Sequence, residues 1–293
     1  MLNITLWGTR GSIPVSGPQF RRYGGATTCI EIELGGQGSS TPSRVIIDGG
    51  SGLAALGRAT EQNWEDTILF QTHFHWDHIQ GFPLFGPLFN PTTNLRLYST
   101  SREGRTLFEV LSDQMKRPLF PVELADIAAT LHFEDIDDSG QRSFGGLAVE
   151  WAEMCHPSGS TAYRISNGES TIVFSGDVEV RSGGRSELIQ LARGADVLIM
   201  DAQYFEHEYP DRMGFGHSTY NDAMEVALEA GVDRLFLTHH DPTHSDDALD
   251  EAVAELRKKV DGPLQIASAR DGLQIAVGEP EGTSEVEIAA QAT

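Results

Sequence analysis

Short apolar runs separated by turns rich in glycine and polar residues are the main pattern of this chain. Runs of this kind, bounded by turn residues, predict β-strands. In the first half, we predict strands over Leu2–Trp7, Cys29–Leu34, Arg44–Asp48 and Thr67–Thr72. In the second half, we predict them over Leu147–Cys155, Ala162–Ser166, Thr171–Phe174, Asp196–Met200, Arg234–Thr238, Leu264–Ala267 and Leu273–Val277.

Helical stretches follow the strands in both halves. We predict helices over Ser51–Thr60, Arg102–Met115, Glu187–Arg193, Tyr220–Ala230 and Asp246–Val260. Ser218 or Thr219 is a suitable N-cap for the helix over 220–230, and Gly231 follows that helix as a stop signal. Two strand-rich halves, each followed by helices, predict an α/β fold in which two sheets pack face to face with helices outside.

The chain reads as one domain with a short tail. Its length of 293 residues suits one large α/β domain, and no linker-like stretch divides it. We therefore predict a single domain over residues 1–278. Residues 279–293 are acidic and small and carry no periodic pattern, which predicts a disordered tail.

The composition is that of a globular protein with a strong negative charge. Hydrophobic residues make up 39% of the chain, and the formal net charge is −22. No stretch approaches the ~18–20 apolar residues of a membrane span. The N-terminal segment lacks the pattern of a secretory signal, and Cys29 and Cys155 suit reduced thiols, so we expect a cytoplasmic protein without a membrane partner. Such a charge repels long nucleic acids, whereas it is compatible with a small anionic substrate that is held by a metal.

The strongest chemical signal is the segment His-Phe-His-Trp-Asp-His, directly after a predicted strand. Four metal-binding side chains in six residues cannot all find separate buried partners in a core. In an extended segment, His73 and His75 point the same way, and a following turn brings Asp77 and His78 to a neighbouring point. The spacing therefore predicts two adjacent metal ions, one bound by the first pair and the other by the second.

These residues match the H-x-H-x-D-H signature of the metallo-β-lactamase superfamily, which the chain resembles from its first strand to about residue 278. The resemblance implies an αββα sandwich. It also implies that Asp48 supports the metal-binding loop, that His156 and His239 are further ligands, and that Asp177 bridges the two metals. For the last ligand, His240 is the alternative, because the two histidines are adjacent in the segment Leu-Thr-His-His-Asp-Pro.

This ligand set implies two divalent metal ions. Histidine and carboxylate ligands without thiolate suit Zn²⁺, with Mn²⁺ and Fe²⁺ as alternatives. Two cations about 3.5–4 Å apart share a hydroxide and lower its pKa, so that it attacks the substrate. In this interpretation Asp77 both binds metal and orients the hydroxide.

The opening Leu-Trp-Gly-Thr-Arg-Gly-Ser-Ile-Pro-Val and the segment Gly216–Thr219 resemble the branch that contains ribonuclease Z and small phosphodiesterases. The resemblance implies that His217 protonates the leaving oxygen or holds the scissile phosphate. The alternative is that Gly216–Thr219 is only a helix-capping turn. Only twenty residues separate His156 from Asp177, which leaves no room there for the long basic arm that grips tRNA.

Residues 81–138 form an insertion beside the metal motif in this interpretation. Its aromatic residues wall a pocket or simply pack the insertion on the sandwich.

From the metal motif, His217 and the missing arm, we predict a phosphodiesterase that acts on a small or cyclic phosphodiester, such as a cyclic nucleotide. The alternatives are a carboxylic ester, lactone or thioester hydrolase, and a non-hydrolytic di-iron oxygen-binding or sensor module. Dimers are frequent in this branch, so a homodimer is a further expectation.

Overall fold

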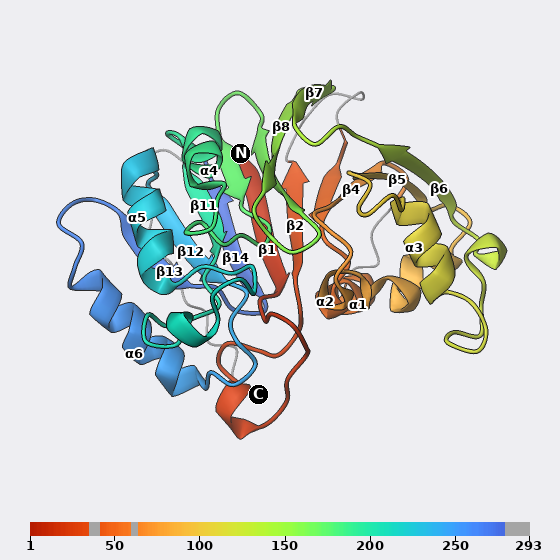
Figure 1. Cartoon of the computed structure of the whole chain (residues 1–293). Helices are drawn as coiled ribbons and strands as arrows, with labels where there is room; N and C mark the ends of the chain where they lie inside the picture. The colour runs from red at the N-terminus through yellow and green to blue at the C-terminus, as the bar shows by residue number, and fades with distance from the viewer. Residues whose placement is uncertain (35–41, 60–63, 279–293) are drawn as a thin grey trace.

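Two β-sheets form the centre of the molecule in the computed structural model, which describes residues 1–34, 42–59 and 64–278. Within those ranges each sheet has seven strands (Figure 1). The first sheet has the spatial order β14 (Leu273–Val277), β1 (Leu2–Gly8), β2 (Cys29–Leu34), β3 (Arg44–Ile47), β4 (Thr67–Gln71), β5 (Asn94–Ser99) and β6 (Thr130–Asp135). Strands β3 to β6 pair in parallel, and the others pair antiparallel.

The second sheet repeats this mixed pattern. Its spatial order is β13 (Gln265–Ser268), β12 (Arg234–Thr238), β11 (Val197–Asp201), β10 (Thr171–Phe174), β9 (Ser160–Ser166), β8 (Leu147–Met154) and β7 (Gly140–Phe144). Strands β10 to β13 are parallel. The inner faces of the two sheets bury one shared cluster of aliphatic and aromatic side chains, including Ile4, Phe70 and Tyr163.

Helices cover the outer faces of both sheets (Figure 1). The α-helices are α1 (Ser51–Ala59), α2 (Trp76–Ile79), α3 (Leu107–Gln114), α4 (Arg185–Ala192), α5 (Tyr220–Ala230) and α6 (Asp246–Arg257). Short 3₁₀ turns are η1 (Pro18–Phe20), η2 (Phe82–Leu84), η3 (Gly86–Phe89), η4 (Leu124–Asp126) and η5 (Tyr209–Asp211). One apolar cluster joins α1 and α3 to the first sheet, and another joins α4, α5 and α6 to the second. The predicted αββα sandwich is confirmed.

The segment 81–138 continues the first sheet. It contributes β5 and β6, which pair in parallel next to β4, together with α3 and three of the 3₁₀ turns. Phe82 and Phe85 are buried in the apolar cluster under the helices, so these two aromatic residues pack the segment on the first sheet. The disordered tail predicted over 279–293 lies outside the described residues.

The carboxyl ends of the central parallel strands carry the predicted site. Asp48 follows β3, and the histidine motif follows β4. Asp177 follows β10, and His239 follows β12. Parallel strands end at one edge of their sheet, where loops bring polar side chains together. The described part of the chain contains no helix long and apolar enough to cross a membrane.

Candidate metal centre

The loop after β4 contributes four side chains to the centre of the site. His73, Asp77 and His78 are buried, while His75 is exposed. His78 Nε2 lies 3.3 Å from Asp77 Oδ2. The backbone turns from extended at His75 into α2, so the motif reverses direction as the spacing predicts.

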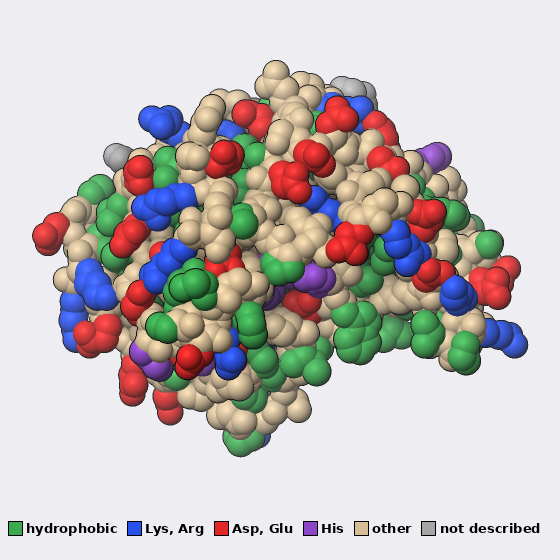
Figure 2. All heavy atoms as spheres, viewed as in Figure 1, with side chains coloured by type: hydrophobic (Ala, Val, Ile, Leu, Met, Phe, Trp, Pro, Cys, Tyr) green, Lys and Arg blue, Asp and Glu red, His purple; other side chains and the backbone are tan. Residues whose placement is uncertain are grey.

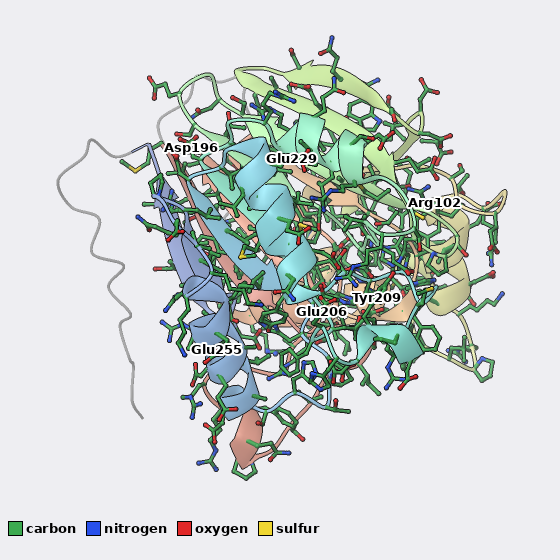
Figure 3. All side chains as sticks on the ribbon, turned by 60° about the vertical axis from the view of Figure 1, so that its left-hand side comes forward. Arg102, Asp196, Glu206, Tyr209, Glu229 and Glu255 are labelled. Carbon is green, nitrogen blue, oxygen red and sulfur yellow. The ribbon has the colours of Figure 1, made fainter. Side chains whose placement is uncertain are left out.

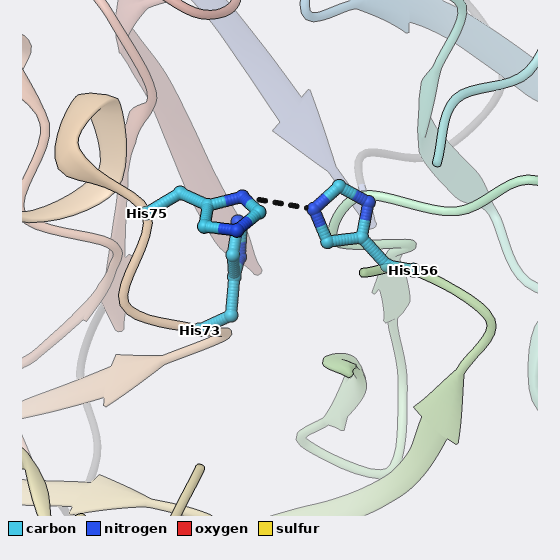
Figure 4. Close-up of side chains that lie close together, drawn as sticks. All are labelled: His73, His75 and His156. Atoms are coloured by element: carbon cyan, nitrogen blue, oxygen red, sulfur yellow. Dashed lines mark hydrogen bonds between the residues drawn. The ribbon is translucent and has the colours of Figure 1, made fainter. Parts of the chain in front are cut away.

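Three side chains reach the same point from the second sheet. His156 follows β8, and its Nε2 lies 3.0 Å from His75 Nδ1, the contact drawn in Figure 4 beside His73. Asp177 Oδ2 lies 3.5 Å from His73 Nε2. His239 Nε2 lies 3.3 Å from the same carboxylate oxygen. The site therefore spans the two sheets.

Asp177 occupies the middle of this arrangement. Its Oδ2 lies 3.2 Å from His78 Nε2 and 3.9 Å from His156 Nε2. Its donor atoms group with His73 and His78 on one side, and with His217 and His239 on the other, within 4.8 Å. A carboxylate placed between two sets of imidazole nitrogens has the position of a bridging ligand.

Each buried imidazole is oriented through the ring nitrogen that points away from the cluster. His78 Nδ1 lies 2.8 Å from Asp48 Oδ2. His156 Nδ1 lies 2.8 Å from the carbonyl oxygen of Gly216. Because a partner on Nδ1 fixes the tautomer and the ring, Nε2 is left free for a cation.

Asp48 is the most heavily used of these orienting groups. It is fully buried and also accepts hydrogen bonds from the backbone and hydroxyl of Thr72 and from the Gln71 amide. Its backbone φ is 65°, a left-handed value that is rare without glycine and that is typical of functional sites. The supporting role implied for Asp48 agrees with these contacts.

The donor atoms present fit divalent cations. His73 Nε2 is buried without a hydrogen-bond partner, and the Nε2 atoms of His78 and His239 face each other at 3.3 Å. Separations between 3.0 and 3.9 Å suit nitrogen and oxygen ligands around ions with bonds of about 2.0–2.2 Å.

Electrostatics at the centre favours bound positive charge. Burial opposes a charge on His239, but Asp177 and Asp77 outweigh burial and raise its pKa to about 9. His78 shows the same balance, and its pKa is raised by Asp177, Asp77 and Asp48. His156 differs, because burial lowers its pKa to about 4. The carboxylates thus draw positive charge to the place where cations would lie.

The structure brings together all the predicted ligands, and it separates the two adjacent histidines. Their order along the chain is His73, His75, Asp77, His78, His156, Asp177 and His239. His240 points away from the cluster: its Nε2 donates to the carbonyl oxygen of Ala269 at 2.9 Å. Burial lowers the pKa of His240 to about 3, which keeps this ring neutral.

His217 lies beside the cluster without belonging to the histidine motif. Its ring stacks on that of His239 with centroids 4.7 Å apart, and its side chain is almost buried. Its Nδ1 lies 2.9 Å from Asp201 Oδ2. His217 takes no part in the cap of α5, because Thr219 and Asp222 form its capping box.

Sequence reasoning missed three residues of this site. Asp201, the last residue of β11, orients His217, and Gln203 Oε1 lies 3.0 Å from His239 Nδ1. The signal for Asp201 was present: an acidic residue ends an otherwise apolar strand at the ligand-bearing edge. The third residue, Glu179, accepts hydrogen bonds from the backbone of the loop before His217.

Comparison with known families and proteins gives a consistent result. A family model described as "Beta-lactamase superfamily domain" matches residues 43–240, a range that contains every site residue described above. The chain is 29% identical to Ribonuclease Z of Archaeoglobus fulgidus, across 95% of this chain and 99% of that protein. It is 31% identical to the uncharacterized protein Rv1339 of Mycobacterium tuberculosis, across 76% of this chain and 78% of that protein.

Among solved structures, the fold is similar to that of YhfI from Bacillus subtilis, a metallo-beta-lactamase fold protein. The TM-score is 0.69 at 20% identity, and the match covers 94% of this chain and all of that one. At this identity the likeness concerns the fold.

Proposed function

Since this chain belongs to the beta-lactamase superfamily and is a metal-dependent hydrolase, we propose that it is a dinuclear phosphodiesterase for a small or cyclic phosphodiester. The observation that carries the proposal is the pair of His217 and Asp201 beside the cluster. Two ligand groups that share a carboxylate suit hydrolysis in general. A separate, oriented imidazole next to them suits a reaction whose leaving group needs a proton.

The predicted ligands divide into two groups. His73, His75 and His156 would hold one ion. Asp77, His78 and His239 would hold the other, with Asp177 between the two. When bound, two such divalent ions, Zn²⁺ first and Mn²⁺ or Fe²⁺ as alternatives, withdraw charge from the phosphate and lower the pKa of a shared water.

Side chains of the chain itself do the remaining work. Asp77 Oδ2 accepts a hydrogen bond from the Ser12 backbone at 2.7 Å, which fixes a carboxylate that orients the attacking water. His217 directs Nδ1 to Asp201, so its Nε2 is the nitrogen available to the substrate. The Asp201 carboxylate holds the ring through Nδ1, and His217 Nε2 gives a proton to the departing oxygen.

The net charge and the short segment between His156 and Asp177 favour a small substrate over RNA, although one relative carries the name ribonuclease Z. Between His156 and Asp177 the chain forms β9 and β10 of the second sheet and no arm. A net charge of −22 opposes a long polyanion, whose binding needs many Lys and Arg contacts.

The proposal is tested by a substrate panel with the metal-loaded protein. The panel contains bis(p-nitrophenyl) phosphate, 3′,5′-cyclic nucleotides, a carboxylic ester, a lactone and a thioester. We expect turnover of phosphodiesters and slow or no turnover of the carbon esters. Preferred turnover of an ester, lactone or thioester would contradict the proposal, and an absorbing di-iron centre without hydrolysis would identify a sensor or oxygen-binding module.

The role of His217 is tested by its alanine variant. His217→Ala should keep both metals and lose about 10²–10⁴-fold in rate on a cyclic nucleotide, whose leaving alkoxide needs a proton. The loss should be much smaller on bis(p-nitrophenyl) phosphate, because nitrophenolate leaves without one. Asp201→Asn should show the same dependence on the leaving group. An equal loss on both substrates would show that His217 binds the phosphate instead.

A further inference from the structure

Large apolar side chains are exposed on the loops that carry or adjoin the residues of the metal centre. Trp76 is 64% exposed, Phe215 is 55% exposed and Ile13 is 50% exposed. Figure 2 shows histidine side chains near the middle of this face, with hydrophobic side chains close to them. Single exposed apolar residues are ordinary, but a group on separate loops around one site indicates a contact surface.

Two contacts across the cluster relate the backbone positions of Trp76 and Phe215. Trp76 follows His75, whose Nδ1 lies 3.0 Å from His156 Nε2. The opposite nitrogen of the His156 ring lies 2.8 Å from the carbonyl oxygen of Gly216, the residue after Phe215. Only the imidazole rings of His75 and His156 therefore lie between the backbone near Trp76 and the backbone near Phe215. The two aromatic residues are therefore carried on opposite sides of the His75–His156 contact, Trp76 after β4 of the first sheet and Phe215 after β11 of the second.

Ile13 lies on a third loop, and this loop contacts the cluster. It follows Ser12, whose backbone N–H donates to Asp77 Oδ2 at 2.7 Å. The loop that carries Ile13 is thus tied to the cluster by a charge-assisted hydrogen bond.

The loop that carries Phe215 is held rigidly. The backbone N–H groups of Gly214 and Gly216 both donate to the carboxylate of Glu179 at 2.9 Å. The Tyr209 hydroxyl, from η5 (Figure 3), donates to the same carboxylate at 2.7 Å. Phe215 lies between the two anchored glycines, so its exposure is built into a fixed loop. An aromatic ring presented in this way loses little entropy when it binds a ligand.

A cation lies beside this ring. The Arg212 guanidinium carbon is 5.8 Å from the centre of the Phe215 ring, within cation–π range. Among the described residues, no carboxylate forms an ion pair with Arg212, whereas Arg181 nearby pairs with both Glu206 and Asp222. In a chain with a net charge of −22, an exposed guanidinium left for solvent beside Phe215 favours an anionic ligand.

We propose that Trp76, Phe215 and Arg212 form a recognition rim for a nucleotide, in which the two rings stack on the base and Arg212 attracts the phosphate. The substrate class is then a small phosphodiester that carries a nucleobase. Stacking on aromatic side chains suits a planar base of any sequence, and the guanidinium suits the negative charge next to it. This inference rests on the proposed phosphodiesterase function and adds the part of the substrate that the metals do not contact.

The test compares 3′,5′-cyclic AMP with an abasic analogue, the same sugar cyclic phosphate with hydrogen in place of the base. We expect a KM about 10-fold lower for cyclic AMP in the unmodified enzyme. Trp76→Ala and Phe215→Ala should each raise the KM for cyclic AMP by about 10-fold and leave that of the analogue unchanged. Arg212→Gln should raise both KM values by about 3-fold. Phe89→Ala, an exposed phenylalanine before β5, is the matched control and should change neither.

A binding measurement separates this inference from the activity. AMP added to the metal-loaded protein should quench the fluorescence of exposed Trp76, and ribose 5-phosphate should not. Trp76→Phe should restore the KM that Trp76→Ala loses, with metal content unchanged in both variants. Equal KM values for cyclic AMP and the analogue would overturn the rim while the phosphodiesterase stands. Absence of turnover on every phosphodiester would instead reject the proposed function. A change of sedimentation in the alanine variants, without a KM change, would identify an interface between copies of the chain and also overturn the rim.

Discussion

At the level of single residues, the adjacent histidines His239 and His240 point in different directions. His239 has a φ of 60°, and this left-handed backbone lets its ring enter the cluster while the next ring turns away. Gln203 holds its Nδ1, which leaves Nε2 near Asp77 and Asp177. His240 is buried, lies near the Arg10 guanidinium and donates to the carbonyl oxygen of Ala269. Backbone conformation therefore decides which imidazole is available to a metal.

Alanine variants of these two residues should have different effects. His239→Ala should lose one equivalent of metal, because it removes a donor between the two carboxylates. His240→Ala should keep two equivalents and lose about 1–3 kcal/mol of stability, because a buried carbonyl is left unpaired. Metal content after dialysis and urea unfolding measure the two effects. Loss of metal in the His240 variant alone would reverse the assignment.

At the scale of the element, tight approach of loops positions the ligands. The backbone at Gly11 lies against the His239 ring, and a Cβ there would meet Nδ1 of that ring at 2.3 Å. Gly216 has a φ of 94°, and a Cβ there would meet Nδ1 of His156 at 2.3 Å. Glycine at both positions lets the backbone of one loop support a ring from another.

Gly11→Ala should therefore displace the His239 ring. We expect the variant to fold, to lose one metal equivalent and to lose most of its activity. Gly49→Ala is the matched control next to Asp48, since its nearest contact would be an ordinary 3.4 Å to Leu53. Metal content and circular dichroism of both variants check this. Full metal binding by Gly11→Ala would show that the ring can move aside without cost.

At the scale of the whole molecule, the cluster joins the two sheets. His73, His75, Asp77 and His78 come from the first sheet, and His156, Asp177 and His239 come from the second. The buried carboxylates of the cluster raise the pKa values of His78 and His239, so they favour positive charge between the two sheets. Metal binding should therefore stabilise the packing of one sheet on the other.

Removal of the metals should lower the melting temperature. A ligand at a hundred times its Kd adds about 2.7 kcal/mol, so chelation should lower Tm by about 5–10 °C. Calorimetry with and without a chelator measures this shift. Asp177→Asn should show a smaller shift, because a neutral amide bridges two cations poorly. An unchanged Tm after complete loss of metal would contradict the stabilising role.

Local patterns in the sequence were sufficient to predict the fold class and the group of candidate metal-binding side chains. The boundaries predicted for the strands Cys29–Leu34 and Arg234–Thr238 and for the helix Tyr220–Ala230 agree with the structure. These elements have clear apolar periodicity or capping residues, which are local properties. The histidine motif was visible for the same reason, since its members lie within six residues.

The remaining features depend on contacts between residues that are far apart in the chain. Strands β5, β6 and β7 were not predicted. Strands β6 and β7 are largely exposed at the edges of their sheets and have no continuous apolar run, and Arg96 interrupts the apolar residues of β5. Gln203 acquires its role only when the ends of β11 and β12 lie side by side, and Asp201 acquires its role only when the loop before α5 returns to the end of β11. The exposure of Trp76 and Phe215 is likewise invisible in the sequence, where large aromatic residues ordinarily indicate core. Periodicity reports which residues face inward along one element, whereas the partner of a side chain is set by the packing of elements far apart in the chain.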